Sequence, residues 1–428
     1  MRSGMTLIEF YDKDAVKNIC SSLVAAPERV ILVGDKQKTM QRCAERYQAV
    51  LAARGVETEF LCRVVNKNQM QSILDALSSI VLEYEDCVFD LTGGEDLYLA
   101  AMGIVCERYR DRDLQLHRFN IRNNTVIDVD QDGKTILTEP APELTVREMI
   151  RIAGGDIVYE EERPGTTHLW EMTPEFREDV SAIWELCRRD MKLWNAQLLV
   201  FETAEQILRD ASALTVSVPT AVLRRAVEDR GGSFFFQREL VRGLVDAGLL
   251  EHLSCDDELF SVTYKDAQIK RCLTLAGRAL EMKVYLAALE ARDKDGSAVY
   301  SDVMNGVFID WDGVIHADQD GYDTENEIDV LMMHGLIPVF VSCKSGIVDK
   351  GEVYKLSAVA ERFGGKNAKK VLIAAALDQS DASHYLRQRA RDMGIRLVEG
   401  SGRDGAEKAF AELTDRELNR VLRSLWSG

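Results

Sequence analysis

The sequence lacks the features that would place the protein in a membrane or outside the cell. No apolar run is long enough to cross a bilayer, and the opening MRSGMTLIEF has neither the apolar core nor the small-residue cleavage site of a secretory signal. The nine cysteines include no C-x-x-C pair, and an odd, scattered set is typical of reduced thiols. The six histidines are isolated and indicate no zinc site. We therefore expect a cytoplasmic protein that has no membrane partner.

The chain is also poor in positive charge relative to negative charge. It has 53 Lys and Arg residues against 71 Asp and Glu residues, a formal net charge of −18, and phosphate contacts need Lys and Arg. The charge is unevenly spread, because residues 344–370 carry seven basic and three acidic residues, whereas residues 310–329 carry eight acidic residues and no Lys or Arg. Such segments could hold divalent cations beside a polyanion, or could be two unrelated solvated faces.

The length of 428 residues predicts two or three domains. Residues 1–155 alternate apolar strands with helices, which predicts an α/β domain with a largely parallel sheet and ligands beyond the carboxyl ends of its strands. Residues 156–170 resemble a linker. Residues 165–270 are mainly helical, and a helix followed by a strand favours either a winged-helix module or a plain helical spacer. Residues 271–428 alternate again and predict a second α/β domain.

The most informative segment of the last domain is NEIDVLMMHGLIPVFVSCK, which predicts a β-hairpin. Because residues two apart in a strand share a face, Glu327 and Asp329 point the same way, as do Ser342 and Lys344. Carboxylates suit Mg²⁺ or Mn²⁺, and a lysine can position or deprotonate water or stabilise charge at phosphorus. The pattern indicates phosphodiester hydrolysis, and a surface hairpin with an Asp–Lys pair is the alternative. The apolar run 339–341 favours hydrolysis, because so buried a strand seldom ends in an unpaired lysine.

Two loops of the first domain have the composition of an anion site. Each follows a strand and precedes a helix, where glycines and the helix N-terminus bring backbone N–H groups to a phosphate. Parallel strands would place both loops at one edge of the sheet, although turn chemistry alone also explains each loop. The candidate residues are Gly34, Asp35, Lys36, Lys38, Thr92, Gly93, Gly94 and Glu95.

The acidic run from Asp128 to Glu139 matches the spacing of a calcium-binding loop. Such a loop needs a helix on each side, whereas TVIDVD and KTILTE are rich in β-forming residues and meet at a Gln-Asp-Gly-Lys turn. We therefore interpret this run as a β-hairpin. The later cluster DQDGYDTENE lacks the glycine that the calcium-loop pattern requires.

In the order of its acids and lysine the chain resembles the PD-(D/E)XK endonucleases. In more detail it resembles the CRISPR-associated nucleases that join a Rossmann-like CARF sensor domain to such a core. The matching segments are GRALEMKVY with Glu281, NEIDV with Asp329, SCK with Lys344, and RFGGK at 362–366. The resemblance implies that Glu281 and Asp329 hold Mn²⁺ or Mg²⁺ while Lys344 acts on the attacking water.

The same resemblance has implications for regulation. It implies a homodimer that binds cyclic tetra-adenylate at the two sensor loops. The bound activator would open the nuclease allosterically, so that it cleaves DNA, RNA or both in type III antiviral defence.

Position 342 departs from the family pattern, which has Asp or Glu two residues before the lysine. Ser342 offers a hydroxyl, a weaker metal ligand, and Glu327, or a water together with the Cys343 carbonyl, could compensate. Otherwise the nuclease core is degenerate. The chain would then be a cyclic-oligoadenylate-responsive transcriptional regulator acting through its middle segment, or a scaffold for a protein partner.

Overall fold

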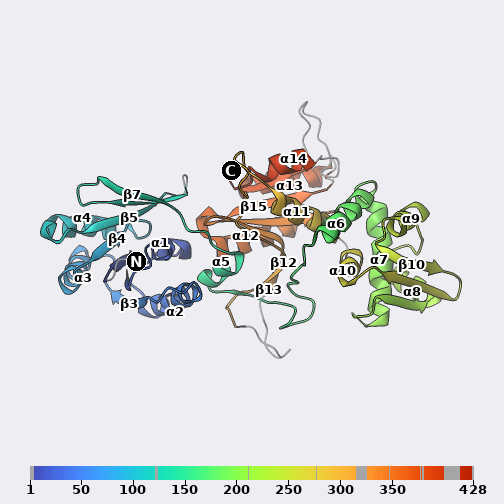
Figure 1. The fold of residues 1–428 in the computed structure, drawn as a ribbon, viewed down its shortest axis with the longest axis horizontal. Helices are drawn as coiled ribbons and strands as arrows, with labels where there is room; N and C mark the ends of the chain where they lie inside the picture. The colour runs from blue at the N-terminus through green and yellow to red at the C-terminus, as the bar shows by residue number, and fades with distance from the viewer. Residues whose placement is uncertain are drawn as a thin grey trace.

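The computed structural model of the chain describes residues 4–120, 124–210, 212–275, 277–314, 325–346, 348–375, 377, 380–399 and 415–426. Within these ranges three β-sheets lie in a row (Figure 1). The sheet of the C-terminal third lies in the centre, between the N-terminal sheet and the sheet built by the middle of the chain. No helix in the described ranges combines the length and the apolar character needed to cross a bilayer. Most of the cluster DQDGYDTENE lies outside the described residues.

The first sheet has the strand order β3-β2-β1-β4-β5-β6-β7. Its strands are β1 (Thr6–Phe10), β2 (Arg29–Gly34), β3 (Glu59–Val64), β4 (Cys87–Asp90), β5 (Gln115–Asn120), β6 (Thr125–Val129) and β7 (Thr135–Pro140). The first five strands in this order are parallel and the last two pairings are antiparallel, which confirms the largely parallel sheet expected here. The central strand β1 was not predicted from the sequence.

Helices pack on both sides of this sheet (Figure 1). They are α1 (Cys20–Ala25), α2 (Gln37–Ala53), α3 (Met70–Glu83) and α4 (Asp96–Arg108). Buried apolar residues of α3 and α4 pack on strands β1, β2 and β4, and this burial stabilises the domain.

The hairpin predicted for the acidic run is confirmed, since β6 and β7 pair in antiparallel fashion. The carboxylate of Asp130 accepts hydrogen bonds from the backbone N–H groups of Asp132 and Lys134, at 3.0 and 2.8 Å. This acid therefore organises its own turn, a common role for Asp in tight turns.

The middle of the chain forms a helical body with a small sheet of order β10-β11-β9. Its elements are α6 (Pro174–Cys187), α7 (Met191–Leu208), β9 (Thr215–Pro219), α8 (Thr220–Asp229), α9 (Arg238–Asp246), β10 (Leu250–Cys255), β11 (Leu259–Tyr264) and α10 (Ala267–Leu273). From α7 to β11 the order is helix, strand, two helices and an antiparallel hairpin, which is the topology of a winged helix.

The third sheet has the order β16-β15-β14-β13-β12-β8. Its strands are β8 (Asp156–Ile157), β12 (Asp302–Asp310), β13 (Glu325–His334), β14 (Ile337–Lys344), β15 (Lys369–Ala374) and β16 (Ile395–Val398). The helices around it are α11 (Arg278–Glu290), α12 (Lys350–Gly364), α13 (Asp381–Asp392) and α14 (Asp415–Leu422). The predicted hairpin is confirmed: β13 and β14 pair around Gly335, whose φ of +59° favours glycine.

One expectation about the chain path was wrong. Residues 156–157, which we expected in a linker, form β8 and extend the third sheet by pairing with Asp310 and Ile309 of β12. The physical reason is that a two-residue strand has no periodicity of its own, and its partner strand lies more than 150 residues further along the chain.

Helix α5 (Val146–Ala153) joins the first sheet to the third. It begins at a capping box formed by Thr145 and Glu148, and it ends at Gly154 with φ of +93°. It packs against α2 on one side and α12 on the other. One continuous apolar core therefore runs from Tyr47 of α2 to Phe340 of β14.

Candidate active site

The predicted acid and lysine meet at the end of the β13–β14 hairpin. Lys344 Nζ lies 3.6 Å from Asp329 Oδ2, and the backbone N–H of Cys343 donates to the same Asp329 oxygen at 2.6 Å. The side chains of Asp329 and Lys344 are 12% and 29% exposed. The two residues therefore lie on one side of the sheet, as the alternation of side chains predicts.

A further carboxylate reaches this cluster from helix α12. Glu352 Oε1 lies 3.4 Å from Lys344 Nζ and accepts a hydrogen bond from Ser342 Oγ at 2.8 Å. Ser342 Oγ also lies 3.2 Å from Asp329 Oδ2. Sequence analysis missed Glu352, because a lone helix acid eight residues after the lysine has no distinguishing pattern.

The helix acid Glu281 approaches from α11, on a different side of the cluster. Its carboxylate pairs with Arg278 one helical turn earlier, with Nη1 and Oε2 2.9 Å apart. Arg278 Nη1 also donates to Asn305 Oδ1 at 3.2 Å, and Asn305 Nδ2 donates to the backbone carbonyl of Asp329 at 2.8 Å. Arg278 and Asn305, neither of them predicted, thus tie the helix acid to the strand acid.

The acids of the cluster influence one another electrostatically. Burial, together with the negative charges of Asp329 and Glu327, raises the pKa of Glu281 to about 8 against the opposing charge of Arg278. Burial likewise raises the pKa of Glu327, with Asp329 again contributing. Three carboxyl groups from α11 and β13 thus share one electrostatic environment, although α11 lies more than thirty residues before β13 in the chain.

Lys344 has a different balance. Burial acts to lower the pKa of its ammonium, but Asp329 and Glu352 outweigh burial and hold that pKa above the ordinary value. The side chain is therefore a cation at neutral pH. Of the roles open at the sequence level, positioning water and stabilising negative charge fit this ammonium, and proton removal by a neutral amine does not.

The donor set fits a hard divalent cation. Within the described residues no three Asp, Glu, His or Cys side chains lie in metal-ligand geometry. The Lys344 ammonium lies near both Asp329 and Glu352. Glu281 Oε2 is buried, and its partner among the described residues is Arg278 Nη1, 2.9 Å away. Clustered carboxylates, two of which have raised pKa values, are suited to Mg²⁺ or Mn²⁺.

Cys343, named as a possible backbone ligand, has its side chain in the apolar core. Burial raises the pKa of its thiol well above the usual value, so this sulfur remains protonated. Its N–H already binds Asp329, and its contribution to the cluster is through the backbone.

The two sensor loops lie at one edge of the first sheet. Strands β2 and β4 both run parallel to β1, which lies between them, so Gly34 and Thr92 follow strands that end at the same edge. A Cβ on Gly93 would lie 2.8 Å from the Phe10 carbonyl oxygen, and one on Gly94, where φ is +96°, 2.7 Å from Phe10 Cβ. The other predicted residues are partly or fully exposed beside these loops: Asp35, Lys36, Lys38 and Glu95.

Neighbouring loops add polar side chains to this edge that sequence analysis missed. Lys67, which follows β3, pairs with Glu95 at 2.7 Å. Asp12 and Lys17, which follow β1, pair at 3.1 Å beside Gly93. Because β1 itself was not predicted, nothing in the sequence placed its exit loop here.

Beneath the sensor edge lies a buried pair of acids, Glu9 on β1 and Asp90 on β4, each 1% exposed. Asp90 accepts hydrogen bonds from Ser21 Oγ at 2.8 Å and from the Thr92 N–H at 2.7 Å. Glu9 accepts one from Ser22 Oγ at 3.3 Å. Burial and the proximity of Asp90 raise the pKa of Glu9 well above its usual value.

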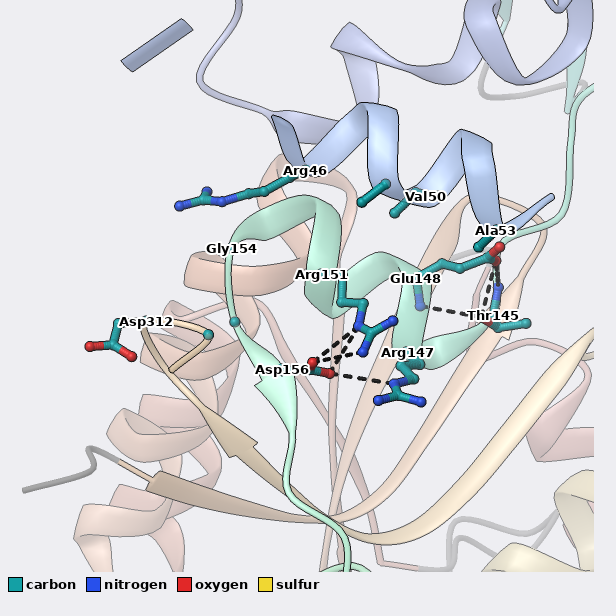
Figure 2. Close-up of a pocket in the computed structure, with 13 residues that line it drawn as sticks. Arg46, Val50, Ala53, Thr145, Arg147, Glu148, Arg151, Gly154, Asp156 and Asp312 are labelled. Atoms are coloured by element: carbon teal, nitrogen blue, oxygen red, sulfur yellow. Dashed lines mark hydrogen bonds and ion pairs between the residues drawn. The ribbon is translucent and has the colours of Figure 1, made fainter. Parts of the chain in front are cut away.

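A cavity of about 570 Å³ lies between α2, α5, β8 and the loop at Gly313 (Figure 2). In Figure 2 the guanidinium groups of Arg147 and Arg151 both point toward Asp156, with ion pairs of 3.4 and 2.9 Å. No member of the acid cluster lines the cavity. The cavity therefore belongs to the junction of the first and third sheets and is separate from the candidate active site.

No protein-family model and no curated protein sequence matches the chain. Solved structures share its fold over nearly the full length of both chains. Protein VC1899 from Vibrio cholerae superposes with a TM-score of 0.68 at 16% identity, over 100% of this chain and 98% of that one. Can2 from Sulfobacillus thermosulfidooxidans, in complex with cyclic tetra-adenylate, superposes with a TM-score of 0.64 at 16% identity, over 99% and 98% of the two chains. These likenesses confirm the α/β architecture.

Proposed function

We propose that the chain is a nuclease that hydrolyses phosphodiester bonds of DNA or RNA and is activated by cyclic tetra-adenylate, as part of type III CRISPR defence. The observation that carries the proposal is the convergence of Glu281, Glu327 and Asp329 around the protonated Lys344. The fold shared with Can2, whose structure contains cyclic tetra-adenylate, supports the activator. The acids come from two elements, α11 and β13, which are separated by more than thirty residues in the chain.

Each side chain of the cluster has a definable task. A divalent cation, when bound, supplies Lewis-acid charge that screens the phosphodiester and favours ionisation of the attacking water. Asp329, Glu281 and Glu327 would hold that cation. Lys344 would donate its N–H groups to the phosphoryl oxygens as negative charge develops there. Arg278 keeps Glu281 oriented toward the cluster.

The sensor edge suits a ligand that carries several phosphates. Lys36 and Lys38 are exposed at the start of α2, and backbone N–H groups at Gly93 and Gly94 lie before α4. A cyclic tetranucleotide has repeated phosphodiesters, so two copies of the chain related by a twofold axis could each bind half of it. This symmetry argument supports the homodimer that we propose.

Activation needs a connection from the sensor edge to the acid cluster. Helix α2 begins at the sensor loop and packs on α5, and α5 packs on α12, which carries Glu352. The cavity beside α5 leaves room for α2 and α5 to move relative to each other. We infer that activator binding shifts this helix stack.

The test is cleavage of labelled single-stranded RNA, single-stranded DNA and plasmid, with and without Mn²⁺ and cyclic tetra-adenylate. We expect cleavage of at least one substrate only when both additions are present. Lys344→Ala should lower the rate by about 100-fold or more, the loss typical for removal of one charge-stabilising donor. The matched control is Lys294→Ala, an exposed loop lysine outside every site described above. Undiminished cleavage by Lys344→Ala, with activator still bound, would contradict the proposal.

A second candidate function is a cyclic-oligoadenylate-responsive transcriptional regulator. It is favoured by the winged-helix order of α7 to β11 and by Ser342 in place of a carboxylate. Against it, the tip of the β10–β11 hairpin is acidic, with Asp256, Asp257 and Glu258 in succession, and would repel phosphates. Sequence-specific duplex binding without metal-dependent cleavage would favour the regulator over the nuclease.

A further inference from the structure

The position two residues before Lys344 has a hydroxyl, whereas the PD-(D/E)XK endonucleases that the chain resembles have a carboxylate there. We propose that Glu352 of helix α12 supplies this carboxylate as a catalytic residue and that Ser342 orients it. The inference rests on the proposed nuclease function and specifies one of its cation ligands. It also explains how a chain with Ser342 can retain an intact centre.

The contacts of Ser342 support this assignment. Its Oγ lies 2.8 Å from Glu352 Oε1 and 3.2 Å from Asp329 Oδ2. A hydroxyl has one proton and can donate to only one of these oxygens at a time. The serine therefore stands between the carboxylates of two different elements and places the Glu352 oxygen in the region that a carboxylate at position 342 would occupy.

The ammonium of Lys344 shows that the two carboxylates face a common cation position. Its Nζ lies 3.4 Å from Glu352 Oε1 and 3.6 Å from Asp329 Oδ2. Both distances are longer than a well-formed charge-assisted hydrogen bond, which is typically about 2.7–2.9 Å. The lysine thus lies near both acids without being closely bound to either. The small hollow beside them is lined by the acids Glu327, Asp329 and Glu352 and also by Lys355.

Local chain geometry explains why a helix residue can replace a strand residue here. Strand β14 ends at Lys344 and α12 begins at Lys350, so the connection is short. The Asp349 side chain caps the helix by accepting from the Gly351 N–H at 3.0 Å. Glu352 consequently lies in the first turn of α12, and its side chain is only 18% exposed.

Helix α12 carries a second glutamate whose local contacts resemble those of Glu352. Glu361 also accepts from a serine, Ser357, at 2.8 Å and pairs with a lysine, Lys370, at 3.2 Å. Its side chain is 68% exposed. This second Ser–Glu–Lys trio has the local contacts of Glu352 but lies outside the acid cluster. Glu361→Gln is therefore the matched control for Glu352→Gln.

The location of Glu352 also bears on regulation. Helix α12 packs on α5, which in turn packs on α2 of the sensor. Movement of this stack would move the Glu352 carboxylate relative to Asp329. The position of Glu352 would thus depend on the helix stack that begins at the sensor loops.

The experiment measures Mn²⁺ binding by electron paramagnetic resonance together with cleavage in the presence of activator, on the full chain. The variants are Glu352→Gln, Glu361→Gln, and the double change Ser342→Asp with Glu352→Gln. We expect Glu352→Gln to weaken Mn²⁺ binding by about tenfold or more and to slow cleavage by about 100-fold, while Glu361→Gln changes neither. The double variant should regain Mn²⁺ affinity and part of the rate, because the carboxylate returns to the strand.

Unchanged Mn²⁺ binding in Glu352→Gln overturns the inference, even if the double variant fails to fold. A folded double variant that binds Mn²⁺ no better than Glu352→Gln overturns it as well. If the wild type binds Mn²⁺ but cleaves nothing, the proposed function fails while the binding data still decide the role of Glu352. If the wild type binds no Mn²⁺, both fail.

Discussion

Two groups of buried acids in this protein have opposite surroundings. In the first domain, Glu9 and Asp90 are almost fully buried and are held by the hydroxyl groups of Ser22 and Ser21. In the candidate active site, Glu281 and Asp329 lie among cations, with Arg278 and Lys344 2.9 and 3.6 Å away. Both groups have acids with raised pKa values, and burial is the largest cause in each.

The comparison shows that a raised pKa does not by itself identify a catalytic acid. Protons and hydroxyl groups satisfy the sensor pair, and its oxygens support the backbone of the ligand loop at Thr92. The acids of the candidate active site are instead paired with cations, Glu281 with Arg278 and Asp329 with Lys344. Clustered carboxylates that already hold cations form the kind of site at which a divalent ion can bind.

The largest expected effect is a difference in cleavage rate between variants of the two groups of acids. Glu281→Gln should lower activated cleavage by about 100-fold, because the cluster loses a cation ligand. Glu9→Gln should change cleavage by less than about twofold when the activator is saturating, because its amide can still accept from Ser22. Cleavage rates of the two variants under the same conditions provide the measurement. Equal losses of cleavage rate in the two variants would contradict the distinction between the two groups of acids.

An intermediate effect concerns the loop that the sensor pair supports. Gly94 has φ of +96°, and a Cβ there would lie 2.7 Å from Phe10 Cβ, so Gly94→Ala strains the loop by about 1–3 kcal/mol. We expect the activator to bind about tenfold more weakly, because 1.4 kcal/mol corresponds to a factor of ten. Calorimetric titration with cyclic tetra-adenylate measures this, and Gly103→Ala, on the open face of α4, is the control. Full affinity of Gly94→Ala for the activator would show that this loop does not take part in ligand binding.

The smallest expected effect is the pH dependence of stability. The pKa of Glu9 is raised in the folded state, so this state keeps its proton after the unfolded chain has lost it. The contribution of Glu9 is therefore fully present below its ordinary pKa and is lost as pH rises through the folded pKa, at up to about 1.4 kcal/mol per pH unit. Glu9→Gln removes this slope, and the Tm of the variant should exceed that of the wild type increasingly from about pH 5 to pH 8. Parallel Tm curves for the two proteins would show that Glu9 titrates normally.

The extent to which the sequence predicted these sites depended on the range of the contacts. The β13–β14 hairpin and the shared face of Asp329 and Lys344 follow from a two-residue period and one glycine turn, so they were predictable. The convergence of the two sensor loops also followed, once the strands were taken to be parallel. The central strand β1 and the edge strand β8 were not predicted. For β8 the reason is that it has only two residues and that its pairing partner is distant.

The side chains of the candidate active site also divide into those that local patterns predict and those that depend on distant contacts. Glu281 was identified only through a family resemblance, since a helix acid in isolation is unremarkable in composition. Sequence analysis missed Glu352, Arg278 and Asn305, because the role of each depends on contacts with residues of other elements. No spacing rule along the chain encodes a contact between a strand end and the first turn of the following helix.

By itself, the sequence determined the alternation of strands and helices, the two α/β regions and the face on which Asp329 and Lys344 lie, because backbone periodicity is a local property. Only the tertiary structure decided that the C-terminal sheet lies between the other two sheets, that Glu352 approaches Ser342, and that α5 packs against both α2 of the first domain and α12 of the third. These relations arise from burial of apolar faces between distant segments, and that burial sets the distances at which charges interact.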